Sequence, residues 1–108
     1  MTRITVFKSK ERYQGFQCLG HAGFAEYQKD IVCASISVLV INTINSIESF
    51  TDDIPEVNTD EKSGLISCSF SQPITANTQL LIDSMLLGLT EIKKQYGRKF
   101  IDIKFEEV

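Results

Sequence analysis

His21 and Cys33 are the two residues of this sequence whose types and spacing could do chemistry. His21 is the only histidine, and Cys33 follows it by twelve residues, near the start of a long apolar stretch. A thiol acts as a nucleophile only in its thiolate form, and both a helix N-terminus and a nearby histidine favour that form. The pair is therefore consistent with a thiol enzyme.

A predicted strand before the pair would orient the histidine. Residues 16–21 alternate as a strand, with Phe16 and Cys18 on one face and His21 on the other. Since Phe16 and Cys18 suit a core, His21 need not point into it. A cysteine–histidine dyad requires only that the two side chains be adjacent in space, not in sequence.

The apolar stretch itself is predicted to be a helix from Asp30 through Ile47. It is rich in Ile and Val, but it far exceeds the usual strand length of about five or six residues. Asp30 is a favoured N-cap, which would put Cys33 in the first helical turn, at the positive end of the dipole. Residues 22–29 include Gly23 and show little apolar periodicity, so we expect a loop there.

Zinc binding and core packing are the alternative explanations of the cysteines. Cys18 and His21 are spaced like a ligand pair, but positions i and i+3 of a strand face opposite sides. Cys33 and Cys68 would have to complete the metal site from separate elements. Because free cysteine is among the most buried residue types, Cys18 and Cys68 are better explained as core residues.

Two polar residues near Cys33 have both a structural and a functional interpretation. Asp30 is better explained as a helix cap than as the acid of a triad. Ser37 lies one turn after Cys33. Its hydroxyl could bond the backbone carbonyl four residues earlier, or it could shape the floor of a site.

The remaining pattern predicts a single α+β domain over residues 1–108. The order β-β-α-β-β-α-β indicates a mixed sheet that carries two helices. Besides the two elements above, we expect strands at 2–8, 57–59, 65–70 and 101–105 and a helix from Thr75 to about Tyr96. Gly88 would leave room for a close helix neighbour, and Gly97 suits the position after the helix end.

Composition narrows the class of protein. The chain has 108 residues and a net charge of −3, from 14 acidic and 11 basic side chains, which argues against a nucleic-acid binder. Three cysteines without paired spacing favour a reducing compartment over a disulfide framework. We find neither a signal-peptide pattern nor an unbroken apolar run of about 18 residues that would span a membrane. The expected location is the cytoplasm.

Two short motifs resemble those of a known family. Gly20-His21-Ala22, followed by Asp30-Ile31-Val32-Cys33-Ala34 and then Ser37, resembles the ribosomal-processing cysteine proteases called Prp. The resemblance extends over essentially the whole chain and implies the small α+β fold of that family, usually as a homodimer. We expect no cofactor and no metal. The implied activity is removal of an N-terminal extension from the twenty-seventh protein of the large ribosomal subunit, after an aromatic residue.

The resemblance also implies roles for individual residues. Cys33 matches the nucleophile and His21 the general base, while Asp30 and Ser37 match two supporting positions. Gly20 and Ala22 flank the histidine in the same motif. Backbone N–H groups at the helix start, that of Cys33 among them, would be candidate donors to the oxyanion.

The loop between the motif halves would act as a lid over an extended substrate. It runs from Ala22 to Lys29 and contains Gly23 and Phe24. Gln28 stands where the family often has glycine, so the loop here would be stiffer or follow another path. The alternative function is a non-catalytic ribosome-assembly or scaffold protein in which Cys33 merely packs beneath the helix cap.

Overall fold

The protein has the predicted α+β order of five strands and two helices. A computed structural model describes the backbone of residues 1–20 and 27–108 and the side chains of 1–20 and 31–108. The elements are β1 (Thr2–Ser9), β2 (Arg12–Leu19), α1 (Tyr27–Phe50), β3 (Glu56–Asp60), β4 (Leu65–Ser69), α2 (Ala76–Tyr96) and β5 (Ile101–Glu107).

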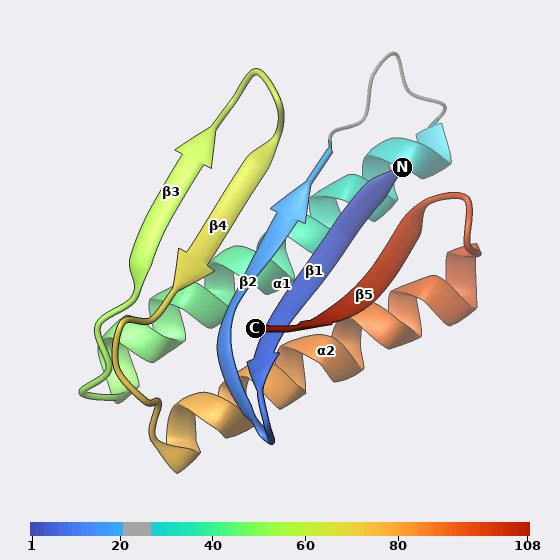
Figure 1. The fold of residues 1–108 in the computed structure, drawn as a ribbon. Helices are drawn as coiled ribbons and strands as arrows, with labels where there is room; N and C mark the ends of the chain where they lie inside the picture. The colour runs from blue at the N-terminus through green and yellow to red at the C-terminus, as the bar shows by residue number, and fades with distance from the viewer. Residues whose placement is uncertain (21–26) are drawn as a thin grey trace.

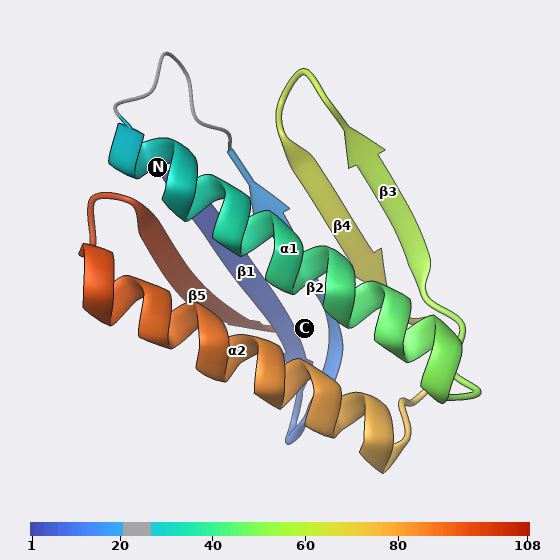
Figure 2. The same cartoon turned by 180° about the vertical axis from the view of Figure 1, so that it is seen from behind.

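The strands form one mixed sheet in the order β3-β4-β2-β1-β5. β1 pairs antiparallel with β2 and parallel with β5, while β4 joins β2 to the edge strand β3. Both helices lie side by side on one face of this sheet (Figures 1 and 2). The mixed sheet with two helices packed on it is therefore confirmed.

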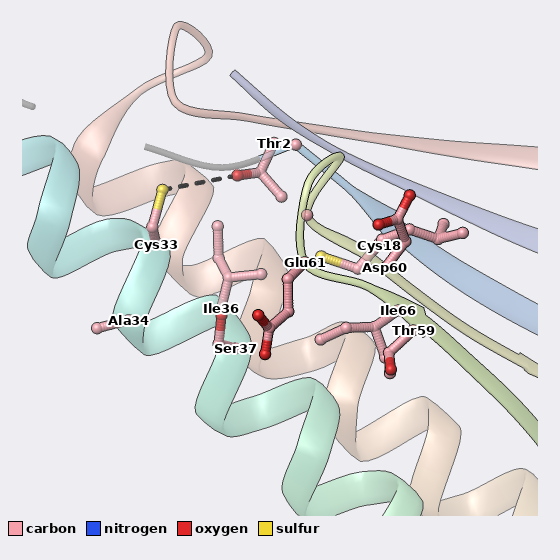
Figure 3. A pocket seen from close by; sticks show the side chains of 13 residues that line it. Thr2, Cys18, Cys33, Ala34, Ile36, Ser37, Thr59, Asp60, Glu61 and Ile66 are labelled. Atoms are coloured by element: carbon pink, nitrogen blue, oxygen red, sulfur yellow. Dashed lines mark hydrogen bonds between the residues drawn. The ribbon is translucent and has the colours of Figure 1, made fainter. Parts of the chain in front are cut away.

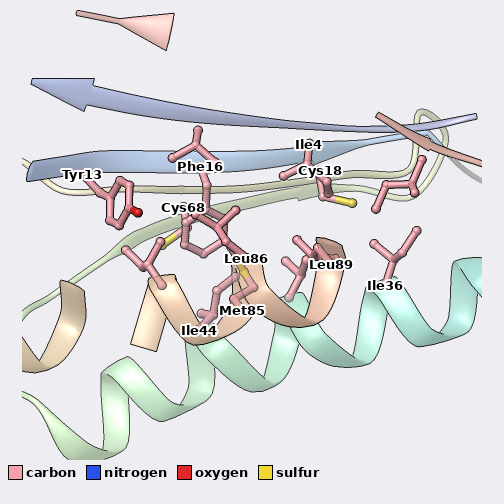
Figure 4. Close-up of a cluster of buried hydrophobic side chains, with 14 of the residues drawn as sticks. Ile4, Tyr13, Phe16, Cys18, Ile36, Ile44, Cys68, Met85, Leu86 and Leu89 are labelled. Carbon is pink, nitrogen blue, oxygen red and sulfur yellow. The ribbon is translucent and has the colours of Figure 1, made fainter. Parts of the chain in front are cut away.

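The core lies between the sheet and the helix pair (Figure 4). β1 contributes the alternating residues Ile4 and Val6, and β2 contributes Phe16 and Cys18. Cys68 of β4 is 1% exposed, so the prediction that Cys18 and Cys68 are core residues is confirmed. The buried face of α1 recurs at helical spacing and comprises Val32, Ile36, Val40, Ile44 and Ile47.

The second helix follows its local signals closely. Thr75 is the N-cap and accepts a hydrogen bond from the backbone N–H of Thr78. At the other end, the N–H of Gly97 donates to the carbonyl of Lys93 over 2.9 Å. A Cβ on Gly88 would come within 2.9 Å of Leu39 on α1, which confirms that this glycine permits close helix packing.

The first helix begins earlier than the sequence pattern predicts. α1 starts at Tyr27, so Asp30 lies inside the helix and is not its N-cap, and Gln28 is helical and not part of a loop. The prediction used apolar periodicity, but a first turn needs no apolar residue, and Gln and Lys are good helix formers. The helix also continues to Phe50, three residues beyond the predicted end.

The second strand is also longer than predicted. It begins at Arg12, four residues before Phe16, and Tyr13 is buried. The β1–β2 register shifts where Phe7 pairs with Gly15 and Lys8 with Tyr13, which leaves one extra residue on β2. This bulge breaks the period-two alternation and hides the start of the strand in the sequence.

Most of α1 is apolar in composition. By length and apolar composition, Ile31–Phe50 would suffice to cross a membrane, and 33% of the stretch is buried inside the protein. Its buried residues pack against the sheet as part of the core. The stretch is apolar on average although Ser, Thr and Asn interrupt it, so it contains no unbroken run of about 18 apolar residues.

Candidate active site

A cavity of about 300 Å³ opens where α1 faces the ends of β1 and β2 and the tip of the β3–β4 hairpin. Its wall is largely apolar, and Cys33 and Ser37 lie on the α1 side (Figure 3). The remaining lining residues are Thr2, Cys18, Gly20, Ala34, Ile36, Thr59, Asp60, Glu61, Gly64, Leu65 and Ile66.

Cys33 is the partly exposed thiol at this cavity. Its Sγ lies 3.8 Å from Oγ1 of Thr2, the first residue of β1. Counted from Tyr27, Cys33 is the seventh residue of α1, so it lies in the second helical turn and not in the first. Its N–H is therefore beyond the first few amides that lack an intrahelical acceptor, which argues against the expectation that it donates to an oxyanion.

Ser37 lines the same cavity one turn further along the helix. The hydroxyls of Ser35 and Thr43 bond the carbonyl four residues earlier, at 2.8 and 2.7 Å. Ser37 makes no such bond, nor any other side-chain hydrogen bond within the described part of the chain. This favours the interpretation in which Ser37 shapes the cavity floor over the one in which its hydroxyl serves the helix backbone.

The other two cysteines differ from Cys33 in their surroundings. Burial raises the pKa of Cys18 to about 11, with a further contribution from the charge of nearby Cys33. Burial also raises the pKa of Cys68 to about 12, with a smaller effect of Glu48. Both thiols therefore stay protonated at neutral pH, and Cys33 is the one placed to react.

Gly20 explains how the chain leaves β2 beside Cys33. Its φ of 116° lies in a region that favours glycine, and a Cβ there would be 2.6 Å from the carbonyl oxygen of Met1. This close approach sets the end of β2 against the start of β1, next to Thr2. Gly20 lines the cavity and directly precedes His21 in the sequence.

Several predicted site residues lie outside the described residues. They are His21, Ala22, Gly23 and Phe24, together with the side chains of Gln28 and Asp30. The dyad geometry and the lid prediction are therefore untested. Of the predicted lid, residues 27–29 belong to α1, which shortens any lid to the segment before Tyr27.

The hairpin wall of the cavity was missed by sequence reasoning. Asp60 accepts hydrogen bonds from the N–H of Lys62 and the hydroxyl of Ser63, so its carboxylate shapes the turn. Glu61 instead turns its carboxylate toward α1 and Ser37 (Figure 3). The turn was predicted, but its place beside α1 depends on the pairing of β4 with β2, which no local pattern reveals.

The zinc alternative finds no support in the described residues. Cys68 packs in the core and does not line the cavity with Cys18 and Cys33. Among the described side chains, those of residues 1–20 and 31–108, no three His, Cys, Asp or Glu residues are grouped so that they could hold a metal ion.

Comparison with known proteins identifies the family. The model of the family described as cysteine protease Prp matches residues 1–101. The chain belongs to this family of cysteine proteases. It is 32% identical over 78 residues to the ribosomal processing cysteine protease Prp of Staphylococcus aureus strain Mu50, covering 72% of this chain and 74% of that protein. With the Prp of Bacillus subtilis strain 168 it shares 28% over 101 residues, 89% of this chain and 90% of the relative.

A solved Prp structure has the same fold. The protease from S. aureus, in complex with a covalently linked product peptide, superposes with a TM-score of 0.86 at 25% identity. The superposition covers 98% of this chain and 100% of that one. Since this agreement includes nearly every residue, the strand order and the helix pair described above are those of Prp.

Proposed function

We propose that this protease removes the N-terminal extension of the twenty-seventh protein of the large ribosomal subunit in the cytoplasm, with Cys33 as nucleophile and His21 as general base. The observation that carries the proposal is the partly exposed Cys33 thiol on an apolar-walled cavity of about 300 Å³. Such a cavity suits an aromatic side chain next to the cleaved bond. The structure of the S. aureus relative contains a covalently linked product peptide, which supports a peptide as the substrate.

The proposed reaction is a thiol-protease cycle. His21 takes the proton of Cys33, and the thiolate attacks the scissile carbonyl carbon to form a tetrahedral intermediate. The imidazolium of His21 then protonates the leaving amine. Water hydrolyses the thioester on Cys33, which releases the new carboxyl terminus of the substrate and restores the thiol. Because the N–H of Cys33 lies within α1, we expect other donors to hold the oxyanion, and the backbone amides nearer the start of α1 are candidates.

The test is incubation of the enzyme with this ribosomal protein bearing its native N-terminus, followed by intact-mass measurement. We expect loss of one N-terminal peptide with wild-type enzyme and no loss with Cys33→Ala or His21→Ala. A matched control is Ser35→Ala, which changes a neighbouring side chain that bonds the carbonyl of Ile31 on the same helix. Cleavage by the Cys33→Ala protein would overturn the assignment of the nucleophile.

The scaffold alternative is distinguished by thiol alkylation. If Cys33 is a catalytic thiol, iodoacetamide should modify it at neutral pH long before Cys18 and Cys68, whose pKa values of about 11 and 12 keep them protonated. A protein with three slow thiols would instead favour a scaffold. Peptide mapping identifies which cysteine carries the label.

We also propose that the enzyme acts as a homodimer. The family resemblance implies this state. In addition, α1 carries no charged side chain between Ile31 and Ile47, and its apolar residues Val38 and Ile41 are exposed. Two copies of an acidic protein could meet on such a face without opposing carboxylates.

A further inference from the structure

We propose that Thr2 is a positioning residue for the reaction, whose hydroxyl donates a hydrogen bond to the sulfur of Cys33 and thereby holds and favours the thiolate. This inference rests on the proposed role of Cys33 as the nucleophile. It adds a residue from β1 to a site whose sequence motifs lie in residues 20–22, after the end of β2, and on α1.

Among the described residues, the sulfur of Cys33 is the one partner of the Thr2 hydroxyl. Thr2 is 3% exposed, and its Oγ1 lies 3.8 Å from Sγ of Cys33. Within the described part of the chain, no other group hydrogen-bonds this oxygen. A thiolate carries no proton and can only accept, so in the reactive form of Cys33 the hydroxyl must be the donor.

The residue type at this position calls for an explanation. Thr2, Ile4 and Val6 all face the core from β1, and Thr2 is the only polar residue of the three. Valine has nearly the same shape as threonine and would avoid the cost of burying a hydroxyl. The hydroxyl is therefore explained by the sulfur that it contacts and not by packing.

The backbone holds Thr2 rigidly in place. Its N–H donates to the carbonyl of Phe100 over 3.0 Å, and Thr2 pairs with Ile101 at the start of β5. On the other side, the close approach of Gly20 fixes the end of β2 against Met1. A donor held from both sides loses little entropy when it bonds the thiolate, which is what preorganisation requires.

The experiment compares Thr2→Val, which removes only the donor, with Thr2→Ser, which keeps it. The rate of iodoacetamide labelling of Cys33 is measured from pH 5 to 10 for both variants and the wild type, with Cys33→Ala as background. We expect Thr2→Val to move the midpoint of the pH–rate profile upward by about one unit and to slow labelling at neutral pH about tenfold. Thr2→Ser should restore most of both, and the melting temperature of Thr2→Val should be unchanged or higher.

An unchanged pH profile in Thr2→Val would overturn the proposal and leave Thr2 as a packing residue. So would an equal shift in Thr2→Ser, because the donor is then irrelevant. These outcomes do not depend on the substrate. Failure of the proposed function appears separately, as absence of cleavage by a wild-type enzyme whose Cys33 still labels rapidly.

Discussion

At the scale of single residues, the three thiols of this protein illustrate how surroundings decide reactivity. Cys18 and Cys33 line one cavity, yet Cys18 is 4% exposed on the sheet while Cys33 is partly exposed on α1 beside a buried hydroxyl. Burial favours the neutral form of a thiol and raises the pKa of Cys18 to about 11. The two cysteines of this cavity therefore have different surroundings, Cys18 buried on the sheet and Cys33 partly exposed on α1.

Replacement of Cys33 should separate stability from activity. Cys33→Ala removes one partly exposed sulfur from α1, so we expect the free energy of unfolding to change by about 1 kcal/mol or less. Cleavage of the substrate should disappear. Chemical denaturation and the intact-mass assay measure the two quantities on the same preparation.

Replacement of Gly20 should lower both the stability and the activity of the protein. In Gly20→Ala a Cβ would lie 2.6 Å from the carbonyl oxygen of Met1, at a φ of 116° that alanine rarely adopts. We expect a loss of roughly 2 kcal/mol or more in unfolding free energy and a strong drop in activity, because the chain before His21 must move. Gly97→Ala is the control, since its φ of 103° imposes similar strain but no atom lies within 4 Å of the added Cβ. Equal activity in the two variants would contradict a special role of Gly20.

At the scale of elements, Asp53 connects the two helices beyond the end of α1. Its carboxylate accepts hydrogen bonds from the N–H of Thr75 over 2.9 Å, from the hydroxyl of Thr75 over 2.8 Å and from the hydroxyl of Thr78. Partial burial opposes ionisation, but the bonds from Thr78 and Thr75 outweigh it and lower the pKa of Asp53. The carboxylate of Asp53 thus holds the N-cap residue Thr75 and the first turn of α2 in place.

A pH-dependent loss of stability follows from this contact. Because the folded pKa of Asp53 lies below its unfolded value, its contribution is complete above about pH 4 and is lost as pH falls through the folded pKa. Asp53→Asn should therefore lower the unfolding free energy by about 1 kcal/mol at pH 7, and its difference from wild type should shrink below about pH 4. Denaturant titrations at several pH values measure this, with Asp52→Asn as the neighbouring control. A difference independent of pH would exclude the ionised carboxylate as the cause.

The elements also show which parts of the structure the sequence could predict. α2 is predicted almost to the residue, because Thr75 and Gly97 are local signals at its ends. The start of α1 is missed, because its first turn carries no apolar repeat, and with it the position of Cys33 in the helix. The hairpin wall with Glu61 and the contact of Thr2 with Cys33 depend on strand pairing across the sheet, which is long-range. The cysteine that we propose as the nucleophile, in contrast, is predicted from its motif alone.

At the scale of the whole molecule, both helices cover one face of the sheet and turn their other sides outward (Figure 2). Exposed apolar side chains are present on both helices, with Val38 at 66% exposed and Ile41 at 46% on α1, and Leu80 and Leu87 on α2. A small protein with a net charge of −3 would gain from covering such a surface with a second copy. This is the face that we expect the homodimer to use.

A charged residue on the exposed apolar face of the helices should separate the protomers of the proposed dimer. In a symmetric dimer each substitution occurs twice, so Val38→Glu would bring two carboxylates into a shared apolar contact and weaken association by at least about tenfold. The fold should persist, since Val38 is mostly exposed and contributes little to the core. Sedimentation equilibrium measures the dissociation constant, and circular dichroism checks the fold. Ile54→Glu is the matched control, because Ile54 is 84% exposed beyond the end of α1 and makes the same change in charge. A wild-type protein that is monomeric at all concentrations would contradict the dimer, whereas a dimer equally tolerant of both substitutions would place its interface elsewhere on the molecule.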